Sequence, residues 1–103
     1  MENLVTAVGI KTHVWNAIVK SFTNERWAIL YKYDLFDAGI DYDLIVIEKN
    51  NERILLGWDN WCEGEIRCSP ERLKDLTAKF NYSFEAGEAG SLKPEVVSIF
   101  WKS

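Results

Sequence analysis

Residues 41–59, DYDLIVIEKNNERILLGWD, decide the fold of this chain of 103 residues. The stretch 42–48 is almost continuously apolar, which is typical of a central strand buried on both faces. Residues 49–52, KNNE, form a polar tight-turn signal, and residues 53–58 then place alternate apolar side chains on one face. The segment therefore predicts two neighbouring antiparallel strands joined by a short turn.

A further strand is predicted on each side of this pair. Residues 26–35 alternate with period 2, and residues 37–41, DAGID, supply the glycine and aspartates of a turn that leads into the central strand. Residues 62–68 alternate small or apolar side chains with charged ones, so we expect one face of this strand in the core and the other in solvent. The charged residues expected in solvent are Glu63, Glu65 and Arg67.

The N-terminal residues follow a helical period instead. Polar side chains at spacings of three and four, with apolar ones between them, predict one amphipathic helix from Asn3 to Thr23. Gly9 lies on the polar face, where glycine costs up to about 1 kcal/mol relative to alanine and is consistent with a break. This helix places His13 in solvent and Trp15 in the core, where we also expect Trp27.

The C-terminal third contains two more helix signals. Ser69-Pro70-Glu71 combines a hydroxyl N-cap, a first-turn proline and an acid near the positive end of the helix dipole. Tyr82 to Phe84 is expected to form a short edge strand, and Pro94 to Lys102 a helix. The sequence therefore predicts a single α+β domain over residues 1–103. It has an N-terminal helix, a four-stranded antiparallel β-meander, a short fifth strand, and C-terminal helices packed on the sheet.

Length and composition narrow the class of protein. A chain of 103 residues can bury roughly 60 to 70% of its unfolded surface, so it needs no disulfide or metal to fold. The longest apolar run, Leu44 to Ile47, is far too short to cross a membrane, and no signal-peptide pattern begins the chain. We therefore expect a cytoplasmic protein without a membrane partner. Cys62 and Cys68 are expected to be small buried hydrophobic residues, because a straight strand separates them beyond disulfide reach.

The acidic residues gather in the middle of the chain. Residues 34–65 contain nine carboxylates and two bases, although the net charge of the whole chain is only −4. Such a surface repels phosphate backbones, so we do not expect it to bind nucleic acid. Because consecutive antiparallel strands alternate in direction, the first and third junctions between strands are expected at one end of the sheet. That end collects the candidate binding residues Asp34, Asp37, Asp41, Asp43, Trp58, Asp59, Asn60, Trp61 and Glu63.

The chemistry of this end suits a positively charged ligand. Carboxylates without neighbouring bases raise one another's pKa and repel until a cation relieves them, and aromatic rings beside them suit cations that carry apolar groups. We therefore expect a non-enzymatic binding protein that docks a basic protein or an organic cation here, with no cofactor and no catalytic residue. Trp61, which follows Asp59-Asn60 in a bend, is the tryptophan expected to be most exposed. The opposite end of the sheet carries Lys49, Asn50, Asn51 and Glu52.

The stretch from Phe36 to Ile66, which contains FDAGIDYD and WDNWCEGEI, resembles small bacterial accessory proteins carried on mobile gene cassettes. The chain is also similar in size and acidity to small α+β immunity and inhibitor proteins of bacterial mobile elements. The resemblance covers about a third of the chain. It implies an accessory binding role and carries over no catalytic residues.

Other interpretations of the same residues stay open. Aspartates are common in hairpin turns for purely local reasons, so turn chemistry alone is as well supported as a binding role. The aspartates also suit Mg²⁺ or Ca²⁺ in a metal-dependent hydrolase, although their spacing matches no EF-hand loop. Homodimerisation is a further alternative, either through the apolar stripe of a helix or through an unpaired edge at residues 26–35 or 82–84. In the last alternative, a pocket for a small hydrophobic cation is lined by Trp58, Trp61, Tyr31 or Tyr33.

Overall fold

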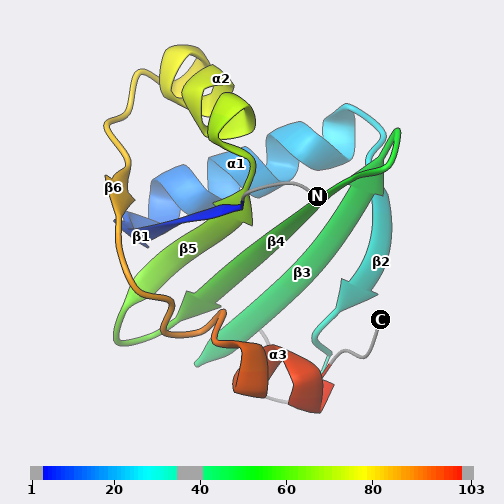
Figure 1. Cartoon of the computed structure of the whole chain (residues 1–103), viewed down its shortest axis with the longest axis vertical. Helices are drawn as coiled ribbons and strands as arrows, with labels where there is room; N and C mark the ends of the chain where they lie inside the picture. Colours follow the sequence, from blue (N-terminus) through cyan, green and yellow to red (C-terminus); the bar gives the residue numbers. More distant parts are fainter. Residues whose placement is uncertain (1–3, 35–40, 101–103) are drawn as a thin grey trace.

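The computed structural model describes residues 4–34 and 41–100, and the side chains of all but the last two of these. The elements, in chain order, are β1 (Val5–Ile10), α1 (Thr12–Asn24), β2 (Ala28–Lys32), β3 (Tyr42–Lys49), β4 (Glu52–Asp59), β5 (Glu63–Cys68), α2 (Pro70–Phe80), β6 (Glu85–Ala86) and α3 (Pro94–Phe100). Figure 1 shows that the strands form one twisted sheet, with α2 beside one end of it and α3 beside the other. The fold is therefore α+β, as the sequence predicts.

The central meander of the prediction is confirmed. Strands β2, β3, β4 and β5 are consecutive neighbours and every pair is antiparallel. Between β3 and β4, Asn50 and Asn51 adopt positive φ angles of 51° and 66°. Asparagine tolerates this left-handed conformation better than most residues, so the KNNE signal forms a tight hairpin. The described sheet nevertheless has six strands, in the order β2-β3-β4-β5-β1-β6, and not the four or five expected.

The predicted N-terminal helix is wrong in its first half. Val5–Ile10 forms β1, which pairs antiparallel with β5 on one side and with β6 on the other, and only Thr12–Asn24 is helical. Gly9 has a φ of 63° and lies where the β1–β5 register shifts, so it permits a bulge in the strand. The spacing of apolar residues in this segment fits both periods, and pairing with a strand far along the chain decides between them.

The C-terminal elements follow the prediction with one correction. The side chain of Ser69 accepts a hydrogen bond from the backbone N–H of Arg72 at 3.2 Å, and Asn81 ends α2 in a left-handed conformation. The short strand is β6 and not Tyr82 to Phe84, because those two aromatic rings pack edge to face against each other and lie against the core instead. The helical tail is confirmed as α3 to Phe100, and the rest of the predicted segment lies outside the described residues.

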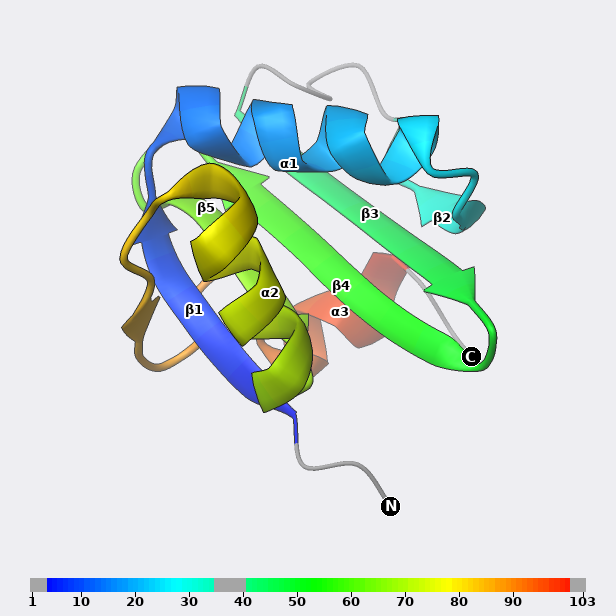
Figure 2. The ribbon, with the colours of Figure 1, turned by 90° about the horizontal axis from the view of Figure 1, so that it is seen from above.

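The sheet carries an apolar cluster on each face. On one face, α1 and α2 contribute Trp15 and Leu76 to a cluster with alternate residues of β3, β4 and β5. Trp27 joins this cluster, so both tryptophans assigned to the core are buried there. On the other face, Leu44 of β3 packs with Leu92 and with α3. Figure 2 shows α1 and α3 on opposite sides of β3 and β4, which separates the two clusters.

The two cysteines have different surroundings. Cys68 is buried, and burial raises the pKa of its thiol to about 12, as for an unreactive core thiol. Cys62 is exposed, which corrects the expectation that both are buried, because it lies in the turn before β5 rather than in the strand. Both are free thiols, and His13 is exposed as expected.

Gly64 sets how closely α1 packs on the sheet. A Cβ placed on Gly64 would lie 2.5 Å from Cδ1 of Trp15. We expect Gly64→Ala to lower the free energy of unfolding by about 1–3 kcal/mol, because the indole ring must move, and urea denaturation measures the loss. The matched control is Ser83→Ala in an exposed loop, which should stay within about 0.5 kcal/mol of the unmodified protein. Equal losses in the two variants contradict this packing.

Candidate functional site

The two junctions expected at one end of the sheet lie there together. The backbone N–H of Asn60 donates to the carbonyl oxygen of Asp41 at 3.0 Å, and the β3–β4 register places Asp43 opposite Trp58. Asp41 and Asp59 therefore lie beside each other, as the alternation of strand directions predicts. These residues come from two turns that are separated by the whole β3–β4 hairpin, so the fold and not the sequence makes them neighbours.

The first junction is described only in part. Asp34 is exposed and follows Tyr33, whose backbone N–H donates to the carbonyl oxygen of Leu44 at 2.9 Å. This bond places Asp34 beside the start of β3. Asp37, the remaining acid expected at this junction, lies outside the described residues.

The turn between β4 and β5 presents an exposed tryptophan. The carboxylate of Asp59 accepts the backbone N–H groups of Trp61 at 2.9 Å and of Cys62 at 2.5 Å. This Asx-type arrangement gives Asp59 a local structural task, which the turn-chemistry interpretation anticipated. Trp61 is 79% exposed, and its exposure was expected from its place after Asp59-Asn60.

Two residues of the predicted site instead anchor α1. The carboxylate of Glu63 accepts the backbone N–H of Thr12 at 2.9 Å and its hydroxyl at 3.2 Å, and the indole N–H of Trp58 donates to the same hydroxyl at 3.0 Å. Lys11, at the N-cap of α1, makes no capping hydrogen bond with its own side chain, so Glu63 satisfies an otherwise unpaired helix N–H from a neighbouring strand. Glu63 and Trp58 are committed to this structural role.

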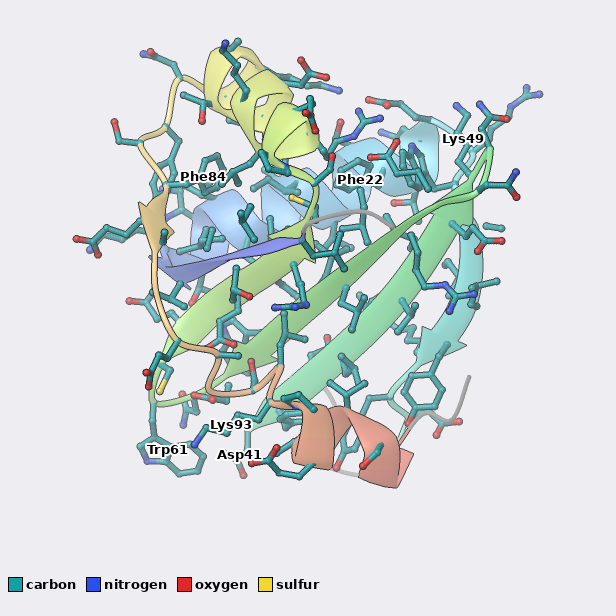
Figure 3. All side chains as sticks on the ribbon, viewed as in Figure 1. Phe22, Asp41, Lys49, Trp61, Phe84 and Lys93 are labelled. Carbon is teal, nitrogen blue, oxygen red and sulfur yellow. The ribbon has the colours of Figure 1, made fainter. Side chains whose placement is uncertain are left out.

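Two bases, Lys32 of β2 and Lys93 before α3, lie close enough to residues at this end of the sheet to affect their pKa values. Burial raises the pKa of the Asp43 carboxyl, and Lys32 of β2 opposes the shift. The charge of Asp59, followed by burial, raises the pKa of the Cys62 thiol, and Lys93 opposes that shift. Figure 3 shows Lys93, Trp61 and Asp41 at the same end of the molecule. The expectation of acids without nearby bases is therefore corrected.

Glu65 is buried. This corrects the prediction that the charged side chains of its strand lie in solvent. Glu65 is 2% exposed, and its carboxylate accepts the backbone N–H of Gly90, at 3.0 and 2.8 Å from its two oxygens, and that of Leu92 at 3.1 Å. These bonds hold residues 90–92, which we call the strap, across β4 and β5. The strap covers the face of β5 that sequence alternation assigned to solvent, and it carries the chain to Lys93.

The aromatic residues proposed for a small-molecule pocket divide between the two faces of the sheet. Trp58 packs against the cluster under α1, whereas Tyr33 and Tyr31 belong to the cluster under α3. Within residues 4–34 and 41–100, no three or more histidine, cysteine, aspartate or glutamate side chains are grouped to hold a metal ion. Over the same residues, no helix has the length and apolar character needed to cross a membrane.

Comparison with known proteins gives no relative of this chain: no family model, curated protein or solved structure matches it. The interpretation of the site therefore rests on its geometry alone. Of the residues predicted, Asp34, Asp41, Asn60 and Trp61 lie at this end, and their side chains make no hydrogen bond to another described residue such as those that occupy Asp59 and Glu63. We call these four residues the Trp61 surface.

The half-buried Asp43 makes stability depend on pH. Because burial raises the pKa of Asp43 above its ordinary value of 3.8, the folded state binds the proton more tightly than the unfolded state does. Ionisation therefore costs stability as the pH rises from below 3.8 through the raised pKa. The free energy of unfolding of Asp43→Asn minus that of the unmodified protein should therefore be larger at pH 7 than at pH 3, because only the unmodified protein carries an ionised carboxylate here at pH 7. Urea denaturation at the two pH values measures this difference. A difference that is constant between these pH values, or larger at low pH, contradicts the burial of this carboxyl.

The strap depends on Glu65. We expect Glu65→Ala to lower the free energy of unfolding by at least about 2 kcal/mol, because two backbone N–H groups lose their acceptor in a buried setting. Glu65→Gln keeps one acceptor oxygen and should lose less. Urea denaturation gives both values, and hydrogen exchange at the amides of Gly90 and Leu92 should accelerate most in Glu65→Ala. Unchanged exchange at these two amides contradicts the assignment.

Proposed function

We propose that this protein is a non-enzymatic binding protein that docks a basic partner protein on the Trp61 surface. The role is that of an inhibitor or immunity protein, such as those carried on mobile gene cassettes. The observation that carries the proposal is the 79% exposure of Trp61 beside Asp41 and Asn60. Tryptophan is the residue most often found as an energetic hot spot when a partner covers it.

The conformation of the turn supports this assignment. The two backbone hydrogen bonds accepted by Asp59 fix the turn that carries Trp61 before any partner arrives. A pre-ordered turn loses less conformational entropy on binding than a mobile one does. Trp15 and Trp27 are buried and Trp58 is partly buried, so Trp61 is the only tryptophan among residues 4–34 and 41–100 that offers most of its surface to a partner.

The charges around Trp61 favour a basic partner. The ion pairs among the described side chains join Glu48 with Arg53, Glu52 with Arg72, and Glu25 with Lys79, all away from this surface. The carboxylates of Asp34 and Asp41 are thus available to steer lysine or arginine side chains. Lys93 offsets part of this charge and limits the expected affinity.

The alternatives have less support. A pocket for a hydrophobic cation needs several rings on one side, and the sheet separates Trp58 from Tyr33. A metal-dependent hydrolase stays a prediction without a supporting observation. The non-enzymatic binding role uses residues whose side chains make no structural hydrogen bonds to the described residues.

The proposal is tested with a short peptide rich in lysine and arginine, titrated into the ¹⁵N-labelled protein and followed by NMR. We expect the largest shifts at Asp41, Asn60 and the Trp61 indole N–H, and weaker binding at higher salt. Trp61→Ala should weaken binding by about fivefold or more, which corresponds to roughly 1 kcal/mol. Asp41→Lys should weaken it further at low salt.

Two control variants match these changes elsewhere on the molecule. Ile29→Ala removes an apolar side chain of β2 that is 49% exposed, and Glu85→Lys reverses an exposed acid on β6. Both should bind the peptide as the unmodified protein does. Equal weakening in the control and test variants, or shifts spread over the whole sequence, contradicts a defined Trp61 surface.

A further inference from the structure

The end of the sheet opposite Trp61 contains a cavity of about 180 Å³. It lies where the C-terminal end of α1, the β3–β4 turn and the first turns of α2 meet, and Figure 3 shows Lys49 at this end. A single water needs roughly 10–15 Å³ of such space, so the cavity has room for a small polyatomic ion. Its lining residues are Glu25, Trp27, Lys49, Asn50, Glu52 and Arg72.

Arg72 is held in one orientation along this cavity. Its Nε and Nη2 atoms both donate to the carboxylate of Glu52 at 2.8 Å, and its guanidinium carbon lies 5.2 Å from the centroid of the Trp27 ring. The bidentate pair and the ring contact fix the guanidinium plane before a ligand arrives. Within the described residues Nη1 makes no hydrogen bond, so both of its N–H groups are available.

Lys49 supplies a second set of donors. Its Nζ atom donates to the carbonyl oxygen of Glu25 at 2.9 Å, which leaves two ammonium N–H groups unused among the described contacts. The carboxylate of Glu25 is already bound by Lys79 and by the hydroxyl of Ser21, and the bond from Lys79, with a smaller effect of Lys49, lowers the pKa of Glu25. Lys49 therefore carries a positive charge without a hydrogen-bonded carboxylate of its own in the part of the chain that the structure describes.

The cavity thus offers N–H donors that no described residue satisfies. Both of its carboxylates are engaged by cations, whereas Nη1 of Arg72, Nζ of Lys49 and the Asn50 side-chain amide retain N–H groups that bond to no residue in the described ranges. We propose that this cavity binds a small oxyanion, a phosphate or carboxylate group, between Lys49 and Arg72. Charge-assisted hydrogen bonds from an ammonium and a fixed guanidinium are the contacts that such groups accept most strongly. The site is independent of the Trp61 surface and of the function proposed for it.

The test titrates inorganic phosphate, and separately acetate, into the ¹⁵N-labelled protein at constant ionic strength with chloride as the reference anion. Saturable shifts at the Lys49 and Asn50 amides and the Trp27 indole N–H are expected, with a dissociation constant in the low millimolar range. Saturation by phosphate alone identifies a phosphate site, and saturation by both anions identifies a general oxyanion site. Lys49→Met should weaken binding by at least about fivefold.

The control variant is Lys11→Met, which removes an exposed lysine side chain at the other end of α1 and should leave binding unchanged. Any one of three results overturns the proposal. The first is that neither phosphate nor acetate produces saturable shifts, and the second is that chloride produces the same shifts. The third is that Lys49→Met binds the anions as tightly as the unmodified protein does.

Discussion

The unbroken pairing of β3 with β4 is the constraint on which both ends of the molecule depend. Eight residue pairs set a single register, and side chains alternate between the faces with a period of two. A slip of one residue would carry Ile45 out of the cluster under α1 and Leu44 out of the cluster under α3. Both clusters therefore oppose the slip. The same register places Asp59 beside Asp41 at one end and closes the tight turn that lines the cavity at the other.

Buried polar groups then attach the peripheral elements to this ladder. The carboxylate of Glu65 binds the strap, and the carboxylate of Glu63 binds the first N–H of α1, so two glutamates of one strand attach two separate elements to the sheet. Each carboxylate accepts more than one hydrogen bond, which is the condition under which a charged group can be buried without a large penalty. Gly57 completes the fit, because a Cβ there would lie 2.7 Å from the side chain of Leu92.

Local periodicity predicts an element correctly where the residues fit one conformation better than any other. It fails where pairing with a distant segment of the chain decides the conformation. Residues 42–58 form their hairpin as predicted, because the apolar alternation and the Asn50-Asn51 turn agree. The direction of the strands then sufficed to bring Asp41 and Asp59 together. Val5–Ile10 was misassigned because its strand conformation comes from pairing with β5 and β6, which no short window of sequence contains. Glu65 and Lys93 were missed for the same reason, since the strap that buries one and positions the other belongs to a distant segment.

A prediction from residue type alone therefore assigns too many residues to a candidate site, because the fold uses many of the same groups for its own hydrogen bonds. Glu63, Trp58 and Asp59 have the chemistry of a binding surface, yet their polar atoms are occupied by Thr12 and by the turn before β5. What distinguishes a residue available for binding is unused hydrogen-bonding or apolar capacity in a fixed position. Trp61 has unused apolar surface, and Lys49 has unused donors. The two proposals place different ligands at opposite ends of one sheet because the carboxylates of Asp34 and Asp41 beside the exposed Trp61 attract cations, whereas the unused donors of Lys49 attract anions.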